Sequence, residues 1–79
     1  MNNQEKLVSA FVEALGVDSS VVINDLKYQS IVEWDSISHM VLISQLEETF
    51  DVSIDTDDVI DLSSVAKAKE ILGKLNIVF

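Results

Sequence analysis

The sequence predicts an all-α fold, a small bundle of three helices with a short extra helix and a long loop between the first and second helices. Apolar residues recur at three- and four-residue spacing in several segments, and these segments end at capping residues or glycines. The chain has 79 residues, 48% of them hydrophobic, which suits one core and leaves no room for a second. We therefore expect a single domain over residues 1–79.

The first two helices are expected at residues 3–15 and 36–50. Gly16 stands where a helix commonly ends, and Asp35 is the expected N-cap of the second helix, because its carboxylate can accept from exposed backbone N–H groups. The apolar positions that predict the buried faces are Leu7, Ala10, Phe11, Ala14 and Leu15 in the first helix, and Leu42, Ile43, Leu46 and Phe50 in the second.

Two more helices are expected in the last third of the chain. A short one at residues 56–61 would be capped by Asp55 or Thr56, and Asp57 and Asp58 suit the positive end of its dipole. Ser63 or Ser64 would cap the last helix, which Gly73 weakens near its end. Its expected buried positions are Val65, Ala68, Ile71, Leu72 and Leu75.

The segment at residues 17–34 shows no sustained periodicity of apolar residues. We interpret it as a long loop whose apolar side chains pack against the rest of the domain. Loops of this length in compact domains are usually functional. An alternative is that residues 21–23 begin a strand, although no partner strand is evident. Trp34, the only tryptophan, is expected to pack against the loop and to fix the approach to the next residues. The apolar C-terminus, residues 77–79, could pack or remain free.

Fourteen acidic residues against five lysines give a formal net charge of −9. This charge would repel nucleic acid and anionic membrane surfaces, so neither is expected as a partner. It would attract proteins with basic docking surfaces, although solubility alone also accounts for it. Residues 1–6 lack the features of a signal peptide, and no stretch approaches 18 apolar residues, so a cytoplasmic location is expected.

Few residues could form a catalytic centre, because the chain has one histidine, no cysteine and no arginine. Ser36 and His39 are three residues apart, but this spacing turns them about 60° apart on a helix, which makes a serine and base pair a poor interpretation. On the same helical wheel His39 faces the core. We expect a histidine at the edge of the core with one ring nitrogen hydrogen-bonded.

The acidic stretch from Asp51 has the alternating oxygen ligands of a calcium loop at its first three ligand positions. Position six is Thr56 where a glycine is needed, and position twelve is Leu62 where a bidentate glutamate is needed. A solvated acidic face is therefore the better interpretation.

The segment at residues 34–50 carries the strongest motif. Asp35 and Ser36 are followed by Ile37, and the helix ends with Leu-Glu-Glu-x-Phe at residues 46–50. The chain here resembles the acyl carrier protein family, in which the attachment motif is Asp-Ser-Leu, with Ile37 in place of the leucine. The likeness continues through Ile54, the acidic short helix and Val65, and so covers nearly the whole chain.

The resemblance implies a carrier that is not an enzyme. A separate phosphopantetheinyl transferase would move 4'-phosphopantetheine from coenzyme A to Ser36, and acyl groups would travel as thioesters on its thiol. In the family, the aspartate that matches Asp35 also helps to hold the magnesium ion used in the transfer. A serine in the first helical turn is exposed, and its phosphodiester would meet unpaired N–H groups and the positive end of the helix dipole.

A second face of the same helix is expected to bind partner enzymes, which would be acyl- or aminoacyl-loading enzymes and acyltransferases or synthases. Its residues are Ile37, Val41, Ser44, Glu47 and Glu48. In fatty-acid carriers the positions that match Ser38 and Val41 are commonly acidic. This difference suggests a carrier for a dedicated biosynthetic pathway with a more hydrophobic docking face, unless Ile37 and Val41 instead lean onto the loop.

Two alternatives stay open from the sequence. One is an aminoacyl or peptidyl carrier loaded by an adenylating enzyme, which Asp35 before the serine slightly disfavours. The other is an acidic helical adaptor that binds a basic partner and is never modified. A monomer is expected in each case, and the cargo is not encoded in any residue that we can interpret.

Overall fold

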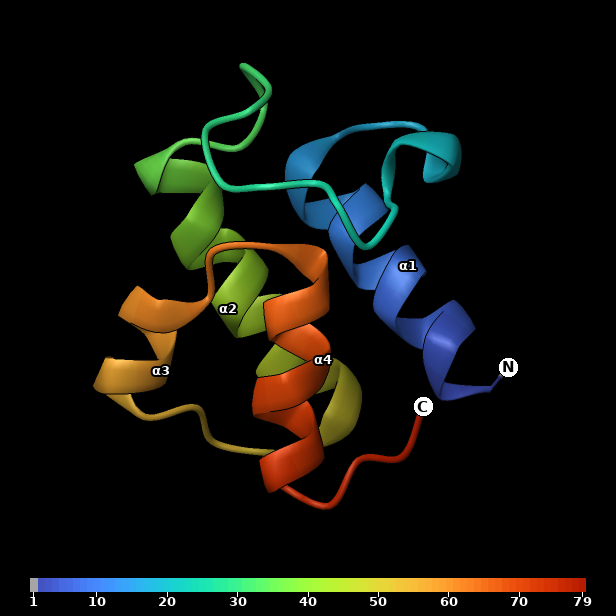
Figure 1. The fold of residues 1–79 in the computed structure, drawn as a ribbon, viewed down its shortest axis with the longest axis vertical. Helices are drawn as coiled ribbons and strands as arrows, with labels where there is room; N and C mark the ends of the chain where they lie inside the picture. Colours follow the sequence, from blue (N-terminus) through green and yellow to red (C-terminus); the bar gives the residue numbers. More distant parts are fainter. Residues whose placement is uncertain (1) are drawn as a thin grey trace.

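A computed structural model describes residues 2–79, and the all-α prediction is confirmed there, with helices and no strand in this part of the chain (Figure 1). The bounds agree with the expected ones for the first three helices. In chain order the elements are α1 (Asn3–Leu15), the 3₁₀ turn η1 (Ser19–Val21), α2 (Ser36–Phe50), α3 (Thr56–Asp61) and α4 (Val65–Lys74).

Both ends of α1 are closed by local hydrogen bonds. The Asn2 side chain accepts from the Glu5 N–H at 2.8 Å, and the Glu5 carboxylate accepts from the Asn2 N–H, which is a capping box. At the other end Gly16 has a φ of 67°, a left-handed conformation that glycine adopts at low cost. The helix therefore ends where the sequence predicts.

The caps of α3 and α4 resolve the choices left by the sequence. Asp55 is the N-cap of α3, but its side chain makes no capping hydrogen bond. Of the two candidate serines Ser64 caps α4, accepting from the Lys67 N–H at 3.0 Å. α4 continues through Gly73 to Lys74. α3 has only 6 residues, and none of them is fully buried. Because a helix this short is not stable by itself, α3 depends on contacts with its neighbours.

The long loop is held by backbone hydrogen bonds to the segment that precedes α4. The Tyr28 N–H donates to the Ser63 carbonyl at 2.9 Å, and the Val65 N–H donates to the Leu26 carbonyl at 3.0 Å. Val21 lies in the η1 turn, so the alternative of a strand at residues 21–23 is wrong. Asp18 caps this turn by accepting from the Ser20 N–H, and such local bonds favour a turn over an extended strand.

Trp34 belongs to the core and is fully buried. Its ring makes edge contacts with Phe11 of α1 at 5.4 Å and with Tyr28 of the loop at 6.1 Å between ring centroids. The predicted structural role of Trp34 is thus confirmed, and its contacts include α1 as well as the loop. The other buried residues are Leu7, Ala10, Phe11, Leu15, Val22, Leu26, Leu42, Ile43, Leu46, Ile54, Leu62, Val65, Ala68, Ile71 and Leu72.

The C-terminal segment returns to the start of α1 (Figure 1). The Asn3 side-chain amide donates to the Val78 carbonyl at 2.9 Å, and the Phe79 ring meets Phe50 of α2 edge to face at 6.0 Å. Of the two possibilities for the apolar end of the chain, packing is the one observed.

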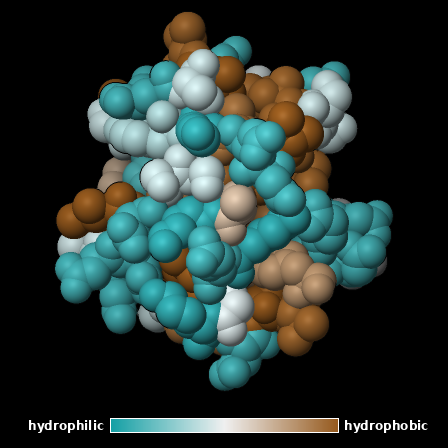
Figure 2. All heavy atoms as spheres, in the orientation of Figure 1, coloured by the Kyte–Doolittle hydropathy of each residue, from teal (hydrophilic) through white to brown (hydrophobic). Residues whose placement is uncertain are grey.

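The surface is mainly hydrophilic with separate apolar patches, as one face shows in Figure 2. Large side chains that stay exposed include Val32 in the loop, Ile37, Met40 and Val41 in α2, and Ile60 in α3. Across residues 2–79 no helix has the length and apolar character needed to cross a membrane.

Candidate functional site

Ser36 is the first residue of α2, and it is exposed. Trp34, two residues earlier, is fully buried and fixes the path of the chain into the helix. The Trp34 N–H donates to the Ile31 carbonyl at 3.2 Å, and its carbonyl accepts from the Gln29 N–H at 3.0 Å. A buried anchor on one side and a helix on the other therefore fix the position of Ser36, which is exposed to solvent.

Asp35 is the N-cap of α2, as predicted. One oxygen of its carboxylate accepts from the backbone N–H groups of Ile37 at 3.0 Å and Ser38 at 2.9 Å. The hydrogen bond from the Ser38 N–H is the main reason why the pKa of Asp35 lies below its usual value of 3.8. Asp35 is therefore a carboxylate at neutral pH, beside the serine.

The neighbouring Ser38 hydroxyl is bound into the cap. It donates to the Glu33 carbonyl at 2.7 Å and accepts from the Asp35 N–H at 2.9 Å. Ser38 therefore completes a capping box around the start of α2. These two hydrogen bonds account for a serine at position 38.

The hydrogen bonds of the Asp35 cap differ in one detail from the site expected from the sequence. From the sequence, a phosphodiester on Ser36 is expected to meet unpaired N–H groups in the first turn of the helix. In the structure the Asp35 carboxylate already accepts from two of these groups, those of Ile37 and Ser38. An anion on Ser36 would keep the favourable helix dipole, but it would share this end of the helix with a carboxylate.

His39 faces inward and is half-buried, as predicted, but both of its ring nitrogens have partners rather than one. The Trp34 indole nitrogen lies 3.0 Å from Nδ1, and the Val59 carbonyl oxygen lies 2.9 Å from Nε2. The ring also stacks on Trp34, with 6.1 Å between the centroids. A histidine engaged at both nitrogens is not free to act as a base on Ser36, which agrees with the rejection of a catalytic pair.

An apolar pocket of about 320 Å³ lies beside Ser36. It is bounded by α2, by α3 and by the long loop, so three elements distant in sequence form its wall. Its lining residues are Tyr28, Ser36, His39, Met40, Val59, Ile60 and Leu62. A group attached to Ser36 thus has an apolar surface next to it.

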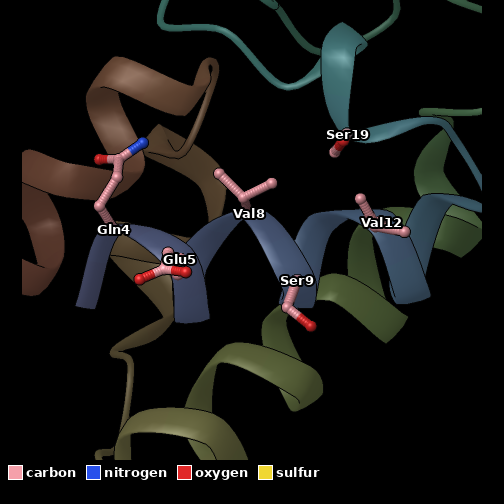
Figure 3. A pocket seen from close by; sticks show the side chains of 6 residues that line it. All are labelled: Gln4, Glu5, Val8, Ser9, Val12 and Ser19. Atoms are coloured by element: carbon pink, nitrogen blue, oxygen red, sulfur yellow. The ribbon is translucent and has the colours of Figure 1, made fainter. Parts of the chain in front are cut away.

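A second, more open pocket of about 490 Å³ lies along α1 and is separate from Ser36. Figure 3 shows the Val8 and Val12 side chains projecting from α1 on the side of Ser19 in η1. Its other lining residues are Gln4, Glu5 and Ser9. None of the site residues predicted from the sequence lines this pocket.

The predicted partner-binding residues lie on α2, and four of the five are exposed. Ile37 is 77% exposed and Val41 is 49% exposed, so neither is covered by the loop. Ser44 and Glu48 are exposed as well. Glu47 is half-buried, and its carboxylate accepts from the Ile54 N–H at 2.8 Å, so it also holds the loop between α2 and α3.

Two apolar residues near Ser36 are missing from the predicted set. Met40 is 59% exposed on α2 and Ile60 is 78% exposed on α3, and both line the pocket beside Ser36. Met40 could have been found from the sequence, because a residue four positions after Ser36 lies on the same helical face. Ile60 belongs to another helix, and no periodicity relates it to Ser36.

The bundle and its exposed first-turn serine define a small helical carrier domain. Residues 5–72 match the family described as "Phosphopantetheine attachment site". An acyl carrier protein of Lactobacillus johnsonii is 32% identical over 82% of this chain and 81% of its own length. Acyl carrier proteins of Akkermansia muciniphila (32% identical, 91% and 90% covered) and Guillardia theta (30% identical, 94% and 95% covered) are similar over still more of the chain.

The chain belongs to the acyl carrier protein family, the phosphopantetheine-binding carriers. Members of this family are non-catalytic, and a phosphopantetheinyl transferase modifies them. The 4'-phosphopantetheine cofactor expected from the sequence is thus confirmed at the level of the family.

Proposed function

We propose that this chain carries acyl intermediates as thioesters on a 4'-phosphopantetheine arm attached to Ser36. The observation that carries the proposal is the position of Ser36, which is exposed as the first residue of α2, between the buried Trp34 anchor and the helix. The nearby Ser38 hydroxyl is engaged in the cap and is a poor acceptor for the arm.

Asp35 is proposed to serve the transfer reaction as well as the helix. One carboxylate oxygen carries both capping hydrogen bonds, so the other oxygen has capacity for a cation. The low pKa of Asp35 keeps this ligand charged, which suits magnesium, a cation that prefers oxygen ligands. The ion would offset the repulsion between Asp35 and the incoming phosphate.

The proposed partners are the transferase, an acyl- or aminoacyl-loading enzyme, and acyltransferases or synthases. We propose that they dock on the α2 face made by Ile37, Val41, Ser44, Glu47 and Glu48. Its first half is apolar and its second half is acidic, so it fits a partner whose docking surface pairs an apolar patch with basic side chains. Such a face suits a dedicated pathway, and we place this single carrier domain in the cytoplasm as a monomer.

Attachment of the arm can be tested by mass. The purified chain is incubated with coenzyme A, magnesium and a broad-specificity phosphopantetheinyl transferase, and intact protein is weighed. We expect one added arm in the wild type and in Ser53→Ala, which removes an exposed serine outside the proposed docking face, and none in Ser36→Ala. An unmodified adaptor predicts no mass change in any of them. Modification of a folded Ser36→Ala variant would refute the assignment.

A further inference from the structure

The two ring nitrogens of His39 have partners that determine its protonation. The Trp34 indole nitrogen can only donate, so Nδ1, 3.0 Å away, accepts and carries no proton. The Val59 carbonyl can only accept, so Nε2, 2.9 Å away, carries the proton and donates. The geometry therefore requires the neutral ring with its proton on Nε2.

The Val59 carbonyl belongs to the last turn of α3. The last four carbonyls of a helix have no partner within it and need one elsewhere. Leu62 donates to the Asp58 carbonyl at 2.9 Å, while the Val59 carbonyl receives its hydrogen bond from His39, twenty residues earlier. His39 thus supplies from α2 a hydrogen bond that the end of α3 requires.

The other polar contacts of α3 are weaker supports. Asp58 pairs with Lys74 of α4 at 2.8 Å and Asp61 pairs with Lys67 at 3.7 Å, in both cases with at least one partner well exposed to solvent. Exposed ion pairs contribute little to stability. The part-buried hydrogen bond from His39 is therefore the polar contact that fixes the last turn of α3, at the wall of the pocket beside Ser36.

The same ring lines this pocket and also stacks on the fully buried Trp34 ring, so it stands where the pocket meets the core. Ile43 and Leu46 follow His39 at one and two turns on the inner face of α2, and both are buried. A group that entered from the pocket and passed between α2 and α3 would have to displace the His39 ring and break its bond to Val59.

We propose that His39 is a positioning residue that holds α3 against α2 and closes the core behind the pocket, so that the group carried on Ser36 stays at the surface. This inference rests on the proposed function for the carried group, but the tie to α3 is a property of the unmodified chain. Closure of the core behind the pocket favours small acyl groups as cargo over long acyl chains, which would have to enter the core.

The tie is tested on the unmodified protein by amide hydrogen exchange. His39→Leu keeps the apolar contacts and removes both hydrogen bonds, and we expect the amides of Val59 and Leu62 to exchange about tenfold faster relative to those of α1. His39→Gln restores a donor and an acceptor and should bring exchange within about threefold of the wild type. Lys74→Ala, which removes the surface pair to α3, should change it less than His39→Leu. Unchanged α3 exchange in a folded His39→Leu variant would overturn the proposal.

Nitrogen NMR of the His39 ring gives a second readout, expected to show a protonated Nε2 and an unprotonated Nδ1. The opposite tautomer would overturn the proposal.

Closure of the core behind the pocket is tested with a carbon-13-labelled octanoyl group on the arm. In the wild type we expect nuclear Overhauser effects between the octanoyl group and Met40 and Ile60, but none with Leu46. In His39→Leu we expect an additional effect with Leu46. Contacts to Leu46 in the wild type would overturn the closure. Failure to attach an arm at Ser36 would contradict the proposed function and leave the exchange result to decide the tie.

Discussion

The Glu47 carboxylate accepts a hydrogen bond from the Ile54 backbone N–H at 2.8 Å. Glu47 lies in the last turns of α2, and Ile54 is a buried residue of the loop that leads to α3. One of the two acidic residues that close the family motif is therefore part of the fold, whereas its neighbour Glu48 is exposed. The two glutamates should differ in their contribution to stability.

We predict that Glu47→Ala lowers the free energy of unfolding by about 1–2 kcal/mol, because it leaves the Ile54 N–H without its partner. Glu47→Gln keeps an acceptor oxygen and should retain most of the stability. Glu48→Ala is the matched control and should change stability by less than about 0.5 kcal/mol. Urea unfolding followed by circular dichroism measures all three. Equal effects of Glu47→Ala and Glu48→Ala would show that the hydrogen bond does not matter.

Trp34 should be the most sensitive position of the long loop. Trp34→Ala removes a fully buried ring that contacts Phe11 and Tyr28, and such substitutions cost about 3–5 kcal/mol. A domain of this size has a net stability of only about 3–5 kcal/mol, so the variant should be largely unfolded at 25 °C.

Val32→Ala is the control within the same loop. Val32 is 92% exposed, and its substitution should leave the helical circular dichroism signal and the melting temperature nearly unchanged. A folded Trp34→Ala variant with a melting temperature close to that of Val32→Ala would contradict the central role of Trp34.

The helices could be predicted from the sequence because their signals are local. Apolar spacing over residues 3–15, Gly16 and Asp35 all act within one or two helical turns, and each is confirmed in the structure. Ser36 could likewise be found from a short motif at a helix start.

The contacts between distant segments could not be predicted in this way. The spacing placed His39 at the core edge, but its bond to Val59 joins residues twenty positions apart and depends on how α3 packs. The bonds of the loop to Ser63 and Val65 are of the same kind. Helical periodicity gives the face of a residue, and only tertiary packing decides which element meets that face.

The Asp35 cap should make stability depend on pH in acid. Hydrogen bonds from the first turn of α2 lower the pKa of Asp35 in the folded state. The folded chain therefore holds its proton less readily than the unfolded chain. The stabilisation is present above the unfolded value near 3.8 and is lost as the pH falls through the lower folded value.

Asp35→Asn is the variant that isolates this effect, because asparagine caps helices about as well and does not titrate. We expect the difference in melting temperature between the wild type and Asp35→Asn to shrink from pH 6 to pH 3. Using the difference removes the general effect of titrating the other acidic residues of this chain. A difference that is constant over this range would contradict a lowered pKa of Asp35.

At pH 7 Asp35→Asn should fold but accept the arm more slowly, if Asp35 binds the magnesium ion.

Val41 offers the sharpest test of the proposed docking face. It is 49% exposed on α2, so Val41→Glu should leave the melting temperature within a few degrees of the wild type. A charge in the apolar half of the face must lose its water when a partner packs against it, which should slow acyl transfer by the pathway's own enzymes at least tenfold. Val78→Glu adds the same charge to another exposed valine near the C-terminus and should not slow transfer. Undiminished transfer to Val41→Glu would show that partners bind elsewhere. Transfer that high salt lowers equally in the wild type and in Val41→Glu would point to the acidic half of the face instead, since screening weakens charge contacts and leaves apolar ones.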